Sequence, residues 1–166
     1  MSGIPVFSFA AYSGAGKTTL LEKLIRELKA RGLRVAAVKH DAHEFDIDKE
    51  GKDSWRFTRA GADVVAIVSD THAAVMENRP TAFEKLISDI TDVDIILAEG
   101  YKTGSYPKIA LRRAGAGKGS GRDFAAELRD CAAAVSDTPV EAPGIPVFGL
   151  EDIAGLADFL CGYVDV

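Results

Sequence analysis

Apolar residues change their spacing twice within the first forty positions. Residues 4–10, IPVFSFA, form a short continuous apolar run rich in β-formers, which predicts a buried parallel strand. From Lys17 onward, leucine and isoleucine recur at helical spacing on one face, and Gly32 is suited to end that helix. Residues 33–40, LRVAAVKH, predict a second strand. The opening of the chain therefore predicts a βαβ unit.

The alternation of strands and helices continues to the end of the chain. Further strands are predicted over residues 63–69, 72–78, 92–100, 106–113, 131–137 and 147–150, with helices over 51–61, 81–90 and 153–164. Strands that alternate with helices favour a mostly parallel sheet with helices on both faces. No repeat and no linker-like stretch interrupts the pattern, so we expect an α/β protein with a single domain over residues 1–166.

Composition narrows the class of protein. A chain of 166 residues with 47% apolar and 27% charged residues is typical of one globular domain. The net charge of -5 argues against a surface built entirely for nucleic acid. Cys131 and Cys161 are interpreted as reduced, small apolar residues. The first residues lack a secretory signal, and no apolar run reaches the roughly 20 residues of a membrane span, so we expect a cytoplasmic protein.

The stretch that joins the first strand to the first helix, residues 11–20, reads AYSGAGKTTL and predicts a phosphate-binding loop. Gly14 and Gly16 allow backbone N–H groups to converge on a phosphate, Lys17 adds a point charge, and the Thr18 hydroxyl is suited to Mg²⁺. Ala11 replaces the usual first glycine, and its methyl group is small enough to be tolerated. The expected nucleotide-binding residues are Ser13, Gly14, Ala15, Gly16, Lys17, Thr18 and Thr19.

A phosphate loop needs a carboxylate at the end of a neighbouring strand, to hold Mg²⁺ through water or to orient the attacking water. Glu99 ends the very apolar run DIILAEG, at the strand end where ligands of open α/β sheets collect. We therefore expect Thr18 and Glu99 near the metal, and Lys17 and Glu99 as the catalytic pair. Asp94 opens the same strand, so it is expected at the opposite edge in a structural role.

Two charged segments adjoin this predicted site. Residues 39–56 contain His40 and His43 among several aspartates and glutamates. A transition-metal site, a solvated charged loop, and a contribution to the Mg²⁺–phosphate shell or to a second substrate all remain open there. Residues 101–122 form a glycine-rich hairpin or loop that has six basic and no acidic residues. It suits either an anionic partner or a solvated surface, and it has few aromatic residues for stacking nucleic-acid bases.

The segments SGAGKTTLLEKLI, VKHDAHEFDIDKEGKDSWRFTRAGA, ILAEGYK, PKIALRR and AVSDTP resemble, in order, the motifs of the MobB family. These are the molybdopterin-guanine dinucleotide biosynthesis adaptors. The resemblance spans nearly the whole chain, and its one clear departure is Ala11. It implies a homodimeric P-loop protein that binds GTP with Mg²⁺, hydrolyses GTP weakly, and works with MobA, the guanylyltransferase that joins GMP to molybdopterin.

The resemblance also implies roles for residues outside the phosphate loop. Lys102 and Lys108 would surround the nucleotide or meet molybdopterin or its guanine dinucleotide. Asp137, after a late strand, is placed to accept hydrogen bonds from guanine. The chain lacks an N-K-x-D motif, which would specify guanine more strongly.

Other functions use the same residues differently. An ATP-dependent small-molecule kinase would hold ATP in the phosphate loop and an acceptor near residues 39–56. A nucleic-acid binder would use the basic segment 101–122, although the net charge disfavours it. If the protein is an enzyme, Arg112 or Arg113 could supply an arginine finger, either in the same chain or across a dimer.

Overall fold

The computed structural model describes residues 3–41, 45–101, 104–116 and 128–164. Its internal contacts divide the chain into two compact units. The first comprises residues 1–40 and 90–166, and the second comprises residues 41–89. The expected single P-loop domain over residues 1–166 stays a prediction.

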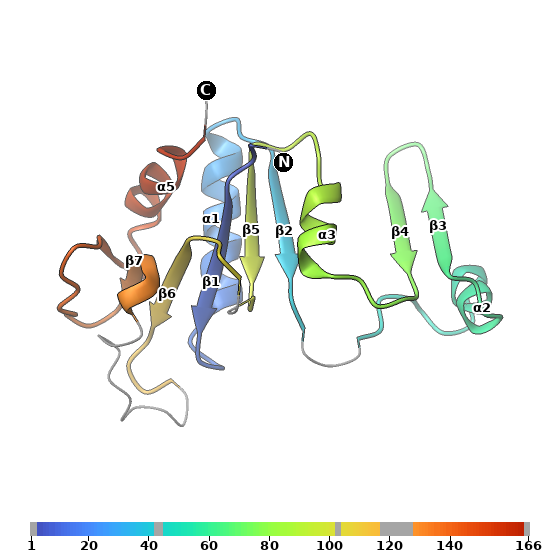
Figure 1. Cartoon of the computed structure of the whole chain (residues 1–166), viewed down its shortest axis with the longest axis horizontal. Helices are drawn as coiled ribbons and strands as arrows, with labels where there is room; N and C mark the ends of the chain where they lie inside the picture. The colour runs from blue at the N-terminus through green and yellow to red at the C-terminus, as the bar shows by residue number, and fades with distance from the viewer. Residues whose placement is uncertain (1–2, 42–44, 102–103, 117–127, 165–166) are drawn as a thin grey trace. The chain divides into compact units, whose positions relative to one another are not determined.

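A six-stranded sheet organises the first unit, in the order β2-β5-β1-β6-β7-β8 (Figure 1). Every neighbouring pair of its strands is parallel. The strands are β1 (Val6–Ala11), β2 (Val35–Lys39), β5 (Ile95–Glu99), β6 (Lys108–Arg112), β7 (Cys131–Ser136) and β8 (Val147–Gly149). The α/β class, with a parallel sheet flanked by helices, is confirmed.

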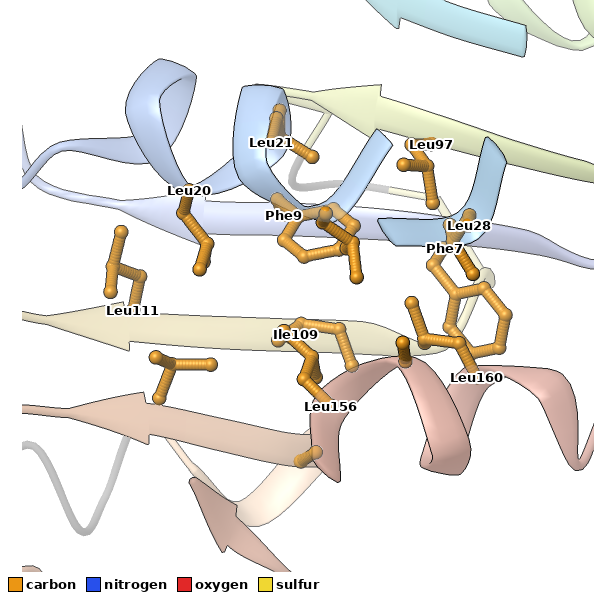
Figure 2. Packing of buried hydrophobic residues seen from close by; sticks show 14 of the residues in the cluster. Phe7, Phe9, Leu20, Leu21, Leu28, Leu97, Ile109, Leu111, Leu156 and Leu160 are labelled. Carbon is orange, nitrogen blue, oxygen red and sulfur yellow. The ribbon is translucent and has the colours of Figure 1, made fainter. Parts of the chain in front are cut away.

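Two helices, α1 (Lys17–Ala30) and α5 (Ile153–Cys161), pack on one face of this sheet. Phe7 and Phe9, which alternate along β1, point from the sheet toward these helices. They are 0% and 1% exposed. Leu24 of α1 and Leu160 of α5 are completely buried in the same cluster, part of which Figure 2 shows. Burying one such side chain contributes about 1.5–3 kcal/mol, so this face supplies much of the core's stability.

The opposite face carries smaller side chains. Ala110 and Ala134 pack there against Leu128 of the short 3-10 helix η1 (Leu128–Asp130). Ser8 of β1 is also buried, and its hydroxyl donates a hydrogen bond to the backbone carbonyl of Tyr101. The connection from β5 to β6 therefore passes over β1 at Ser8.

The second unit contains α2 (Asp53–Arg59), α3 (Phe83–Asp89) and a hairpin of β3 (Val64–Val68) and β4 (Ala73–Glu77). Both strands were predicted, but they pair antiparallel in a separate two-stranded sheet. The reason is the four-residue connection 69–72, closed by a 2.8 Å hydrogen bond from the Ser69 N–H to the His72 carbonyl. A connection this short can join only antiparallel neighbours.

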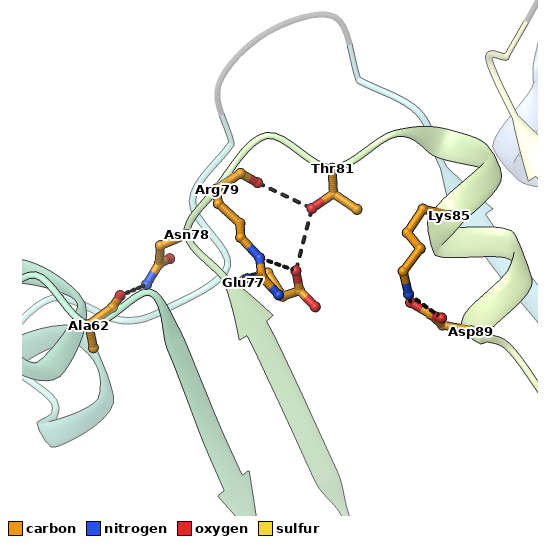
Figure 3. A network of polar contacts seen from close by, with 7 residues as sticks. All are labelled: Ala62, Glu77, Asn78, Arg79, Thr81, Lys85 and Asp89. Atoms are coloured by element: carbon orange, nitrogen blue, oxygen red, sulfur yellow. Dashed lines mark hydrogen bonds and ion pairs between the residues drawn. The ribbon is translucent and has the colours of Figure 1, made fainter.

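Polar contacts follow β4 toward α3 (Figure 3). Arg79 donates to Glu77 at 2.8 Å, and Lys85 forms an ion pair with Asp89 one helical turn further on. The Arg79 guanidinium lowers the pKa of the Glu77 carboxyl. The cations of this region are thus matched by carboxylates within the same unit.

Candidate functional site

The glycine-rich loop joins β1 to α1 at the carboxyl edge of the parallel sheet. Gly14 and Gly16 have φ angles of 80° and 89°, in the left-handed region that glycine adopts without strain. The Gly16 carbonyl accepts the 2.9 Å hydrogen bond from the Leu20 N–H that starts α1. The loop therefore ends at a helix N-terminus, where unpaired N–H groups and the helix dipole favour an anion.

Ala11 is the last residue of β1 and lies in register with Leu111 of β6. It is half-buried and packs against the hydrophobic cluster on the helical face. The methyl group that departs from the motif therefore belongs to the sheet, ahead of the two left-handed glycines. This position is the physical basis for the prediction that the methyl group is tolerated.

Glu99 and Thr18, which are 81 residues apart in sequence, meet at this edge. The Thr18 hydroxyl donates to the Glu99 carboxylate, with oxygen–oxygen distances of 3.2 and 3.4 Å. Register places Glu99 beside Phe9 of β1, just ahead of the loop. Neighbouring ligands of an octahedral Mg²⁺ lie about 2.9 Å apart, given Mg–O distances of about 2.0–2.1 Å. The hydroxyl and carboxylate are thus the oxygen donors that Mg²⁺ prefers, and they lie slightly further apart than two neighbouring ligands of a bound ion.

A tight backbone contact links β2 and β5 beside Glu99. The His40 N–H donates to the Glu99 carbonyl at 2.8 Å. Gly100 has a φ of 90°, and a Cβ there would lie 2.9 Å from the His40 carbonyl oxygen. Gly100 is therefore required for this close approach.

The His40 ring lies 5.3 Å from the Tyr101 ring in an edge-to-face arrangement, while His43 lies outside the described residues. No group of three or more His, Cys, Asp or Glu side chains suited to a metal occurs in the part of the chain that the structure describes. The transition-metal alternative depends on His43 and Glu44, which lie outside the described residues, so it stays open.

Asp137 follows β7 at the same edge of the sheet. Both of its carboxylate oxygens accept the backbone N–H of Ala114, at 2.9 and 3.1 Å. Ala114 lies in the turn after β6, so this carboxylate ties the end of β7 to that turn. Sequence reasoning selected Asp137 for guanine and did not foresee this contact.

The basic residues of segment 101–122 that the structure describes, Lys108, Arg112 and Arg113, lie at different levels of the sheet. Lys108 begins β6, in register with Ser8, whereas Leu111 is level with Ala11. Lys108 precedes Leu111 by three strand residues, so it lies about 10 Å along the strand from the carboxyl edge that carries the loop. Lys102 is outside the described residues. Arg113, which follows β6, reaches the loop: its Nη1 lies 3.6 Å from where a Cβ on Gly16 would stand.

A glycine-rich loop between β1 and α1, with an acid on the adjacent β5, defines a P-loop nucleotide-binding fold. The model of the MobB family, molybdopterin guanine dinucleotide synthesis protein B, matches residues 6–137. The chain therefore belongs to the MobB family.

Individual relatives agree with this assignment. An Escherichia coli (strain K12) molybdopterin-guanine dinucleotide biosynthesis adapter protein is 39% identical, covering 95% of this chain and 91% of the relative. The corresponding protein of Haemophilus influenzae is 46% identical over 66% of this chain and 64% of its own length. The crystal structure of Bacillus subtilis MobB matches with a TM-score of 0.77 over 98% of this chain and 99% of that chain, at 24% identity. That last similarity supports the fold.

Within the described ranges, none of the helices is both long enough and apolar enough to span a membrane.

Proposed function

We propose that this protein binds GTP with Mg²⁺ in the loop after β1 and acts as an adaptor in the synthesis of molybdopterin guanine dinucleotide. The observation that carries the proposal is the contact between the Thr18 hydroxyl and the Glu99 carboxylate beside two left-handed glycines. Family membership supports the pathway, because the similar proteins of Escherichia coli and Haemophilus influenzae are adapter proteins of that biosynthesis.

In this proposal, backbone N–H groups of residues 13–19 hold the phosphates, and the Lys17 ammonium neutralises charge on the β- and γ-phosphates. Thr18 and Glu99 hold the Mg²⁺, which supplies further neutralisation when bound. Glu99, directly or through a water molecule, orders the water that attacks the γ-phosphate. Without an arginine correctly placed against the γ-phosphate, hydrolysis is slow. Slow hydrolysis fits an adaptor better than a fast enzyme.

Guanine preference and the second substrate are further parts of the proposal. Asp137, after a parallel strand at the carboxyl edge, is the residue expected to accept from guanine N1–H and N2–H₂. Both of its oxygens already accept the Ala114 N–H, so we do not assign the guanine preference to this carboxylate. Lys102, two residues after Gly100, is the basic residue of this region that we propose to meet molybdopterin or its guanine dinucleotide. The position of Lys108 behind the edge gives it a weaker basis for that role.

Association with a MobA-like guanylyltransferase and with a second copy of this chain completes the proposed assembly. The homodimer is supported by one face of the β3–β4 hairpin, which presents Val64, Val68 and Val75 at 45%, 81% and 67% exposure. Ala66 pairs with Val75 and Val68 with Ala73, so these apolar residues share one face of the hairpin. A two-stranded hairpin is marginally stable alone, and covering this face would stabilise it.

Sedimentation of a Val68→Lys variant tests the dimer. The added charge should shift the protein toward monomer, whereas Val147→Lys on β8, another exposed valine, should leave the mass unchanged. A wild-type protein that sediments as a monomer, or a Val68→Lys variant that still dimerises like wild type, would contradict the proposed interface.

Calorimetric titration of GTP and, separately, ATP with Mg²⁺ tests the nucleotide proposal. We expect GTP to bind at least about tenfold more tightly, which corresponds to about 1.4 kcal/mol. Equal binding, or a preference for ATP, would contradict the GTP assignment and favour the small-molecule kinase. That alternative also requires transfer of phosphate to an acceptor, so release of inorganic phosphate alone would count against it.

A further inference from the structure

The turn after β6 brings a cationic side chain to the phosphate loop. Ile109 and Leu111 of β6 point to the face covered by α1 and α5, and continuing this alternation puts Arg113 on the same side. Its Nη1 lies 3.6 Å from the position of a Cβ on Gly16. Arg112, by the same alternation, shares the opposite face with Ala110.

The Arg113 guanidinium carries a permanent charge and presents several N–H donors in a planar fork, which suits phosphate oxygens. Among the described residues, no carboxylate forms an ion pair with Arg113 or with Lys17. Lys17 is the first residue of α1 and Arg113 approaches the N-cap residue Gly16, so both positive charges add to the positive end of the helix dipole, which an anion would neutralise. The arrangement is therefore suited to a polyphosphate.

Asp137 fixes the backbone from which this side chain projects. The Ala114 N–H, which it binds through both carboxylate oxygens, belongs to the peptide group between Arg113 and Ala114. The Arg113 carbonyl in turn accepts the Ala116 N–H at 3.2 Å. Asp137 is anchored because β7 pairs with β6, with Ser136 in register with Arg112. The carboxylate therefore restricts the turn on the side where Arg113 leaves it.

We propose that Arg113 contacts the bound polyphosphate and that Asp137 is a positioning residue for Arg113. This inference rests on the proposed nucleotide site. It selects one of two adjacent arginines and gives Asp137 a role that does not depend on the base of the nucleotide.

Calorimetry with Mg²⁺ and either GTP or ATP, on folded protein, tests Arg113. Losing a charge-assisted hydrogen bond costs about 10-fold or more in affinity, so Arg113→Ala should weaken both nucleotides by at least that factor. Arg113→Lys should recover part of the loss. Arg112→Ala is the matched control, because it removes the same charge one residue away. Arg113→Ala binding within about twofold of wild type, or an equal loss in Arg112→Ala, would overturn the proposal.

Two variants of Asp137 separate positioning from base recognition. An asparagine oxygen still accepts the Ala114 N–H, so Asp137→Asn should stay within about threefold of wild type for both nucleotides. Asp137→Ala should weaken GTP and ATP alike, and should add little in an Arg113→Ala background, as expected for residues acting through one another. A loss confined to GTP in Asp137→Asn, or full additivity with Arg113→Ala, would overturn the positioning role.

The same titrations distinguish failure of this inference from failure of the proposed function. A wild-type protein that prefers ATP contradicts the GTP assignment, yet the Arg113 and Asp137 effects would still be expected. A wild-type protein that binds neither nucleotide would overturn both.

Discussion

The strand β5 has an acidic residue at each end, and the two are held in different ways. Asp94, just before Ile95, accepts the Arg34 N–H at 2.6 Å and the Arg34 guanidinium at 2.7 and 3.3 Å. Glu99, the last residue of the strand, meets the Thr18 hydroxyl at 3.2 Å. One acid is neutralised by an arginine, while the other faces a hydroxyl at the start of α1.

The difference follows from the direction of the parallel sheet. The helix that follows β1 starts at the carboxyl edge, so its N–H groups and positive dipole lie near Glu99. At the opposite edge the chain passes from the end of α1 into β2, and there Arg34 and Asp94 hold β2 and β5 together. An acid at the carboxyl edge is thus available to a ligand, whereas the acid at the other edge stabilises the sheet.

The largest expected effect at the carboxyl edge is that of Lys17→Ala. Removing the charge that neutralises the β- and γ-phosphates should weaken Mg²⁺–GTP binding at least about 100-fold, or about 2.7 kcal/mol. Calorimetry measures the loss, and an unchanged thermal midpoint shows that the variant is folded. Unchanged affinity would defeat the assignment of this loop.

Glu99→Gln should lower GTP hydrolysis by about 10- to 100-fold, because the amide is a poor base and a weaker Mg²⁺ ligand than the carboxylate. A single-turnover assay over a range of Mg²⁺ concentrations should also show a higher Mg²⁺ requirement. The thermal midpoint should change little, since the Thr18–Glu99 contact is exposed. Wild-type hydrolysis in this variant would remove Glu99 from the mechanism.

Asp94→Asn should have the reverse pattern: nucleotide binding unchanged and stability slightly lower, with a midpoint shift of about 3 °C or less for an exposed pair. Hydrogen bonds from the Arg34 side chain and backbone lower the pKa of Asp94 from 3.8 to about 2.

Folding favours the carboxylate form of Asp94, so its ion pair contributes fully to stability above about pH 5. That contribution is lost progressively as the pH falls toward about 2. Thermal melts from pH 6 to pH 2 should therefore show wild type losing its advantage over Asp94→Asn in that window. A constant difference between the two proteins would contradict the ion-pair explanation.

The smallest expected effect is the coupling between the two acids. Five residues of extended strand separate them by about 16 Å. The stability changes of Asp94→Asn and Glu99→Gln should therefore add, to within about 0.5 kcal/mol, in the double variant. Denaturant unfolding of the four proteins measures this, and a larger coupling would mean that the two edges are not independent.

The different positions of Asp94 and Glu99 at the two ends of β5 could be predicted from the sequence. The apolar run DIILAEG, with an acid at each end, predicts a buried strand and places Glu99 at the ligand edge and Asp94 at the other. The glycine-rich loop and the helical period after Lys17 predict β1, the loop and α1. These are local patterns, and the structure confirms the strands and the helix they predict.

Other features depended on contacts between distant segments. Spacing cannot tell Arg112 from Arg113, because their positions relative to Gly16 depend on which face of β6 each occupies after the sheet has formed. Asp137 reaches Ala114 only because β6 and β7 are neighbours. The hairpin of β3 and β4 also lies in its own sheet, which the strand pattern alone does not reveal.

Hydrophobic period and glycine placement are local properties, so they were enough to predict the elements, the phosphate loop and the edge at which an acid must lie. Tertiary structure alone decided that Thr18 meets Glu99 and that Arg113 approaches Gly16 beside the turn held by Asp137. Strand order and register bring together residues that are tens of positions apart, and that pairing depends on how whole strands bury their faces.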